Sequence, residues 1–71
     1  PHLHGSFPVA LADMCSEPRG REALVQRYAG SFTSLNGGGT SLNCGILQTA
    51  RSEQRYSGTA VHIVTRTDRE L

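Results

Sequence analysis

An asparagine followed by three glycines, at residues 36–39, is the clearest break in this chain of 71 residues. Glycine adopts backbone conformations that other residues avoid, and asparagine tolerates the left-handed region, so this stretch favours a turn. The residues just before the break are mostly Ser, Thr and Gly, which also favour turns over helix interiors. We therefore predict a flexible turn here, with the regular elements on either side of it.

Before the break, residues 15–30 carry the features of a helix. Ser16 can act as the N-cap, and Pro18 falls in the first turn, where its missing N–H costs little. Gly30 is typical of the residue that ends a helix. We therefore predict a helix that begins near Ser16 and ends at Gly30.

Three other segments have the composition of strands. Pro8 favours an extended entry to the apolar run 9–12, so we predict a strand within residues 6–14. The segments 40–50 and 57–67 are rich in Thr, Val, Ile and Leu, and a charged stretch separates them. This pattern predicts an antiparallel hairpin.

The predicted order of strand, helix, strand and strand indicates an α+β fold, a small single domain with one helix packed on an antiparallel sheet. In an alternative, residues 27–35 form a strand that turns through the glycines into the next segment, which gives an all-β meander. The two alternatives assign different structures to the same residues. We take residues 1–71 as one domain, with 1–6 as a frayed N-terminal segment.

Two short echoes occur in the sequence: "QRYAGS" at 26–31 returns as "QRYSGT" at 54–59, and "TSLNGG" at 33–38 returns as "TSLNCG" at 40–45. Repeat folds need about three or more copies to bury a continuous core. In the predicted fold the first "QRY" copy ends a helix and the second opens a strand, so we predict no shared structure. The second echo predicts a loop.

Charge and cysteine content limit the partners. The formal net charge of +1 predicts no strong attraction of the whole molecule to nucleic acid or to an anionic membrane surface. No run approaches the roughly 18 apolar residues that a membrane span needs. For Cys15 and Cys44 we favour free thiols and a cytoplasmic protein, with a disulfide and secretion as the alternative.

A chain this short buries a small share of its surface, and only 37% of its residues are hydrophobic. We therefore expect a non-enzymatic protein-interaction module or small subunit that completes its core by self-association or by binding a protein partner. The expected interface residues are Leu24, Val25, Tyr28, Val61 and Ile63. No cofactor and no metal are predicted.

An alternative function is an RNA-binding protein, or a small ribonuclease or toxin. The residues that suggest it are Arg51, Glu53, Arg55, Tyr56, His62 and Arg66. Glu53 would act as the base toward the 2′-hydroxyl and His62 as the acid toward the leaving oxygen. Arg55 and Arg66 would hold the phosphate.

The first residues of the chain suggest two further hypotheses. His2 and His4 could bind a metal with Cys15 or Cys44, although a structural zinc site needs four ligands. Pro1 resembles the base of the tautomerases, enzymes of similar length in which a free N-terminal proline takes the proton.

The tautomerase resemblance implies a strand that begins at the proline, then a helix and a second strand, with arginines that bind the substrate carboxylate. A tautomerase-like enzyme is therefore the third functional hypothesis. Gly5 and Pro8 depart from the family pattern, because they interrupt the segment that would be the first strand.

Overall fold

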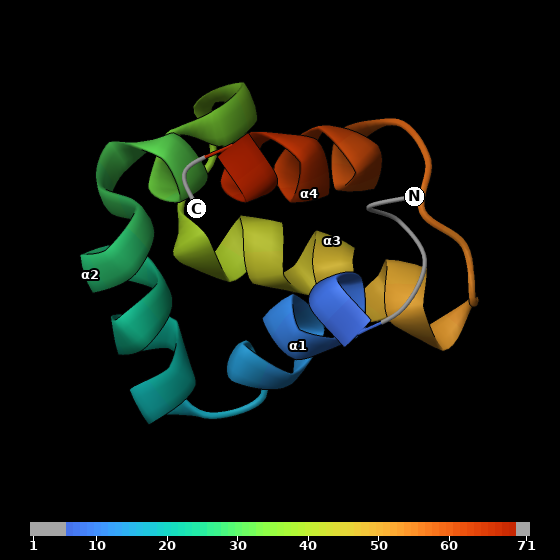
Figure 1. The fold of residues 1–71 in the computed structure, drawn as a ribbon, viewed down its shortest axis with the longest axis horizontal. Helices are drawn as coiled ribbons and strands as arrows, with labels where there is room; N and C mark the ends of the chain where they lie inside the picture. The colour runs from blue at the N-terminus through green and yellow to red at the C-terminus, as the bar shows by residue number, and fades with distance from the viewer. Residues whose placement is uncertain (1–5, 70–71) are drawn as a thin grey trace.

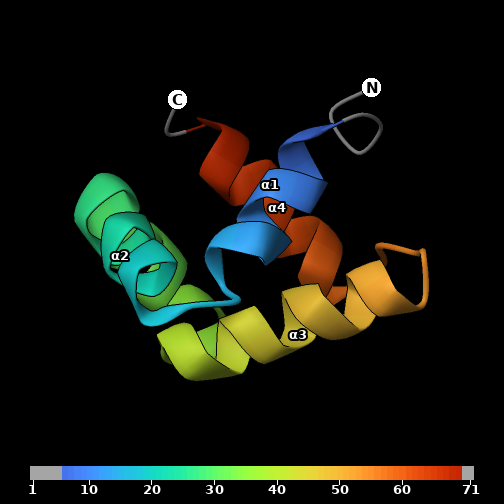
Figure 2. The same cartoon turned by 90° about the horizontal axis from the view of Figure 1, so that it is seen from below.

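Four α-helices make up residues 6–69, the part of the chain that the computed structural model describes. They are α1 (Ser6–Met14), α2 (Pro18–Thr33), α3 (Thr40–Ser52) and α4 (Thr59–Arg69), with a short 3₁₀ turn, η1 (Leu35–Gly37), between α2 and α3 (Figure 1). Over these residues no strand is present. α3 packs against each of the other three helices, and in Figure 2 it runs along the lower edge of the molecule, beneath α1 and α4.

The predicted α+β fold is therefore wrong, and α4 shows why. The buried residues of this helix are Ala60, Ile63, Val64 and Thr67. Their spacing is the period of a helix and not the alternation of a strand. The β-branched residues that suggested a strand cost less than about 0.7 kcal/mol each in a helix, and burial of this stripe against the core outweighs that cost.

The other two predicted strands are helices as well. Segment 6–14 is α1, and segment 40–50 forms most of α3, whose buried residues again follow helical spacing. The predicted hairpin does not form, and residues 27–33 continue α2 instead of beginning a strand. The all-β alternative is therefore wrong too.

α2 confirms the predicted helix and corrects its start. Pro18 lies in the first turn, as predicted. The N-cap is Glu17, while the Ser16 hydroxyl donates a hydrogen bond to the Ala12 carbonyl in α1 (3.3 Å). Ser16 therefore contributes to the end of α1 and not to the start of α2.

α2 also continues past the predicted end at Gly30. Ala29 has a non-helical backbone (φ 46°, ψ −130°), after which the helix continues to Thr33. A positive φ strains an alanine by about 1–3 kcal/mol. Phe32, just beyond this kink, is fully buried, so its packing offsets the strain.

The sequence echoes have no common structure. Residues 26–31 lie in α2, whereas 54–59 form the connection into α4 and its first residue, as the prediction of unlike structures required. The loop predicted for the second echo is wrong for residues 40–45, which begin α3.

The core lies between the four helices. Its apolar side chains are Leu11, Ala12, Leu24, Tyr28, Phe32, Leu47, Ile63 and Val64, together with the two cysteines. The chain's own helices bury these side chains.

A disulfide between Cys15 and Cys44 joins the end of α1 to α3, with 5.3 Å between the two Cα atoms. The prediction of free thiols is therefore wrong. The bond is fully buried. Asp13 and Arg51 form an ion pair that also joins α1 to α3, on the surface of the molecule.

Asn43 fixes α3 against the end of α2. Its side chain is fully buried, and its Nδ2 donates a hydrogen bond to the Phe32 carbonyl (2.5 Å). This bond satisfies a carbonyl in the last turn of α2, where helix carbonyls lack partners within the helix.

Gly20 permits the close approach of α2 to α1. A Cβ atom at this position would overlap the Met14 carbonyl oxygen. Only glycine fits there without a shift of the backbone. By contrast, a Cβ atom at Gly45, in the middle of α3, would meet nothing within 4 Å.

Replacement of both cysteines by alanine should lower the free energy of unfolding by about 2–5 kcal/mol, because the denatured chain gains freedom when the crosslink is lost. Urea unfolding followed by circular dichroism measures the change. The exposed Ser41→Ala variant is the control and should stay within about 0.5 kcal/mol of the wild type. A double variant as stable as the oxidised wild type would contradict the prediction.

Two glycine substitutions should have opposite effects on stability. Gly20→Ala should destabilise by about 1–3 kcal/mol, because the new methyl group overlaps the Met14 carbonyl. Gly45→Ala should stabilise by about 0.5–1 kcal/mol, because alanine is the better helix former and has room. Thermal unfolding of both variants under the same conditions provides the comparison, and a change of the same sign in both would refute it.

Candidate functional site

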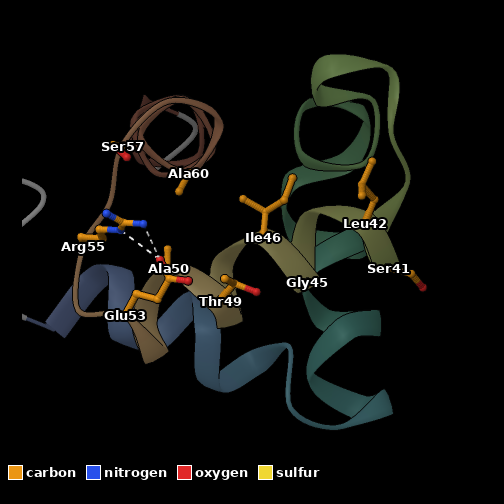
Figure 3. A pocket seen from close by; sticks show the side chains of 10 residues that line it. All are labelled: Ser41, Leu42, Gly45, Ile46, Thr49, Ala50, Glu53, Arg55, Ser57 and Ala60. Atoms are coloured by element: carbon orange, nitrogen blue, oxygen red, sulfur yellow. Dashed lines mark hydrogen bonds and ion pairs between the residues drawn. The ribbon is translucent and has the colours of Figure 1, made fainter.

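A groove of about 480 Å³ runs between α3 and α4 (Figure 3). Its lining consists of Ser41, Leu42, Gly45, Ile46, Thr49, Ala50, Glu53, Arg55, Ser57 and Ala60. In Figure 3, Ala60 points from α4 toward α3. We call this surface the neutral groove, because its two charged side chains form an ion pair with each other.

The inward side of α3 decides which residues line the neutral groove. Asn43, Cys44 and Leu47 point into the core. At about 3.6 residues per turn, Gly45 then lies on the outward side. Leu42 lies there too and is 55% exposed, which is unusual for a large apolar side chain in this molecule.

The neutral groove falls in a part of the chain without charge. Between Arg27 and Arg51 the sequence contains no charged residue. Sequence reasoning treated this stretch as a turn and a strand, and it missed Leu42, Gly45 and Ile46 as surface residues. The long gap between charged residues was the signal that could have indicated them.

The ion pair at one end of the neutral groove is positioned by the end of α3. Gln54 has a positive φ of 57°, and the Arg55 N–H returns to the Ala50 carbonyl (2.9 Å). This is the hydrogen-bond pattern of a helix that ends in the left-handed conformation. The turn brings Arg55 back to Glu53, with 2.8 Å between Nη2 and Oε1.

The predicted ribonuclease residues do not meet in one site. Glu53 and Arg55 line the neutral groove, whereas His62 and Arg66 line a different hollow on α4. His62 is two residues from Ala60, about 200° further around the helix, and so faces away from the groove. The proposed base and acid are therefore on different faces of the molecule.

The remaining two residues of that predicted cluster lie elsewhere. Arg51 pairs with Asp13 of α1. Tyr56 is half-buried against the core, and no described group forms a hydrogen bond with its hydroxyl oxygen. Burial raises the pKa of Tyr56 above its usual value of 10.0, the positive charge of Arg51 opposes the rise in pKa, and Asp13 adds to it.

The predicted interface residues divide into two groups. Leu24, Tyr28 and Ile63 are buried in the core of the chain itself. Val25 is 39% exposed on α2, and Val61 is half-buried on α4. Of the predicted interface residues, only Val25 and Val61 are accessible to a partner.

The metal and proline hypotheses fall largely on residues that are not described. Pro1, His2 and His4 lie outside residues 6–69, and so does most of the predicted frayed segment. Cys15 and Cys44, the other proposed ligands, are bonded to each other. Among residues 6–69, no group of three His, Cys, Asp or Glu side chains is placed to hold a metal ion.

Comparison with protein-family models, with curated proteins and with solved structures finds no match to this chain. Within residues 6–69, every helix is too short or too polar to span a bilayer. The site must therefore be interpreted from its own residues.

Tyr56→Phe should remove an alkaline dependence of stability. The pKa of Tyr56 is raised in the folded state. The contribution of Tyr56 to the free energy of unfolding is therefore fully present below pH 10.0, and it is lost as the pH rises through the pKa of the folded state. Unfolding midpoints measured from pH 8 to 11 should fall more steeply for the wild type than for Tyr56→Phe. At neutral pH the variant should match the wild type or gain about 1 kcal/mol, because an unpartnered hydroxyl is removed. Parallel alkaline curves for the two proteins would contradict this assignment.

Proposed function

We propose that this protein is a non-enzymatic interaction module that pairs with a second copy of itself through the neutral groove. The observation that carries the proposal is the uncharged, partly apolar outward side of α3. Interface centres are depleted in charged residues, because a charge without a partner is costly to remove from water. Burial of Leu42 against a second copy would remove the largest exposed apolar side chain of α3 from water.

Gly45 supports the pairing independently. A glycine in the middle of a helix costs about 0.5–1 kcal/mol relative to alanine, and nothing inside the described chain requires one at this position. Gly20, by contrast, is required by the contact between α1 and α2. A bare backbone at Gly45 lets the helix of a second copy approach closely.

The ends of α3 favour an antiparallel arrangement of the two copies. The N-cap residue, Gly39, provides no side-chain hydrogen bond, so backbone N–H groups at the start of α3 remain open. Glu53 is the C-cap at the other end, and its contact with Arg55 uses only Oε1. Antiparallel pairing places each carboxylate near the positive end of the other copy's helix.

The disulfide determines the compartment that we propose for the module. Disulfides persist in oxidising environments and are rare in the cytosol. We therefore assign the module to an oxidising compartment, as the sequence predicts for a bonded pair. The ribonuclease alternative has less support, because Glu53 and His62 line different hollows.

Sedimentation velocity over a range of protein concentrations tests the pairing. The wild type should shift from monomer to dimer as its concentration rises. Leu42→Glu should weaken the association at least about tenfold, because an unpaired carboxylate would have to be removed from water in the interface. Val25→Glu is the matched control, since it places the same charge at an exposed apolar position outside the neutral groove, and it should dimerise like the wild type.

Two results would overturn this function. One is a wild type that remains a folded monomer at the highest soluble concentration. The other is an equal loss of association in Leu42→Glu and Val25→Glu, which would indicate an effect of net charge and not of the groove.

A further inference from the structure

α4 has a second exposed side, which is basic. His62, Arg66 and Arg69 are four and three residues apart, so their side chains share one face of the helix. With Leu35, Val61 and Thr65 they line a hollow of about 340 Å³. We call this surface the basic face of α4.

The hollow continues toward the start of α4. A second hollow of about 490 Å³ shares Leu35 and His62 with the first, and it is also lined by Asn36, Gly58 and Thr59. The N-terminus of a helix carries partial positive charge. Both ends of this combined surface are therefore electropositive.

The cations of the basic face are available to a ligand. Arg51 and Arg55 are paired with Asp13 and Glu53, but neither Arg66 nor Arg69 forms an ion pair with a described residue. Among the described residues that line the two hollows, none is acidic. The two arginines also offset the negative end of α4, but that role accounts for neither His62 nor the hollow.

We infer that the basic face of α4 binds an extended acidic peptide. His62 and Arg66 are about 6 Å apart along the helix axis, at about 1.5 Å per residue. Alternate residues of an extended chain are about 6.6 Å apart and point to the same side. Acidic residues at every second position of the peptide would thus meet these groups in turn.

The lining of the hollows favours a peptide over RNA. Leu35 and Val61 can contact the apolar side chains of a peptide, and guanidinium groups bind carboxylates through two parallel hydrogen bonds. Recognition of single-stranded RNA depends on stacking of bases on aromatic rings. His62 is the only aromatic ring among the described lining residues, and a single ring is too little for the stacking of successive bases.

Fluorescence anisotropy with a labelled peptide of about eight residues, alternating Glu and Val, tests the inference. The peptide should bind, and an increase in salt from about 50 to about 200 mM should weaken the binding several-fold. A peptide with Lys in place of Glu should not bind. Arg66→Gln with Arg69→Gln should weaken binding at least about tenfold, because the two guanidinium groups that bind the peptide carboxylates are lost.

The matched control is Arg19→Gln with Arg27→Gln, which removes the same charge from exposed positions on α2. Its affinity for the peptide should stay within about twofold of the wild type.

Amide chemical-shift changes on titration of the wild-type protein with the peptide should concentrate in α4 and η1, which tests the location of the site without a variant. Leu42→Glu should leave peptide binding unchanged, so this result does not depend on the pairing of two copies.

Three outcomes would overturn the inference. The first is no detectable binding of the Glu peptide at millimolar protein. The second is an equal loss of peptide affinity in the two double arginine variants. The third is tighter binding of a single-stranded oligouridylate of the same charge, which would indicate a nucleic-acid surface.

Discussion

The bond between Cys15 and Cys44 is the constraint on which the rest of the structure depends. It joins the end of α1 to α3, which packs against each of the other three helices. Together with the hydrogen bond of Asn43 to the end of α2, it fixes how α3 is rotated about its own axis. Because Asn43 and Cys44 both point inward, the opposite side of α3 must face outward. The neutral groove is therefore a consequence of the core contacts of α3.

α4 separates two surfaces of different chemistry. Its apolar stripe packs into the core, Ala60 lies at the wall of the neutral groove, and His62 and Arg66 lie on the far side. The helix is 11 residues long, so each surface is built on about three turns. A partner on one surface leaves the other free. In the two proposals, one short helix thus serves two partners of different kinds, a neutral helix and an anionic segment.

The sequence predicted α2 but not the other helices, and the difference has a physical cause. Pro18 in the first turn of α2 is a local signal, and it holds whatever the rest of the chain does. α4 has no comparable signal, and its Val, Ile and Thr residues have strand propensity. Its helical stripe becomes favourable only because α3 and α2 are there to bury it. The disulfide was likewise only the alternative prediction, because a separation of 29 residues does not indicate whether the two Cα atoms come together.

The residues of the predicted site do not lie together, for a related reason: closeness in sequence was taken for closeness in space. Arg51 lies within α3 and pairs with Asp13 of α1, whereas the turn at Gln54 returns Arg55 to Glu53. His62 lies on another face of the molecule, on α4. Charged residues suggest functional sites because their chemistry is specific, yet here four of them form two ion pairs with each other. Paired surface charges contribute little to stability and are costly to desolvate. A long uncharged stretch with an unexplained helix glycine is therefore the basis on which we propose where two copies of this chain pair.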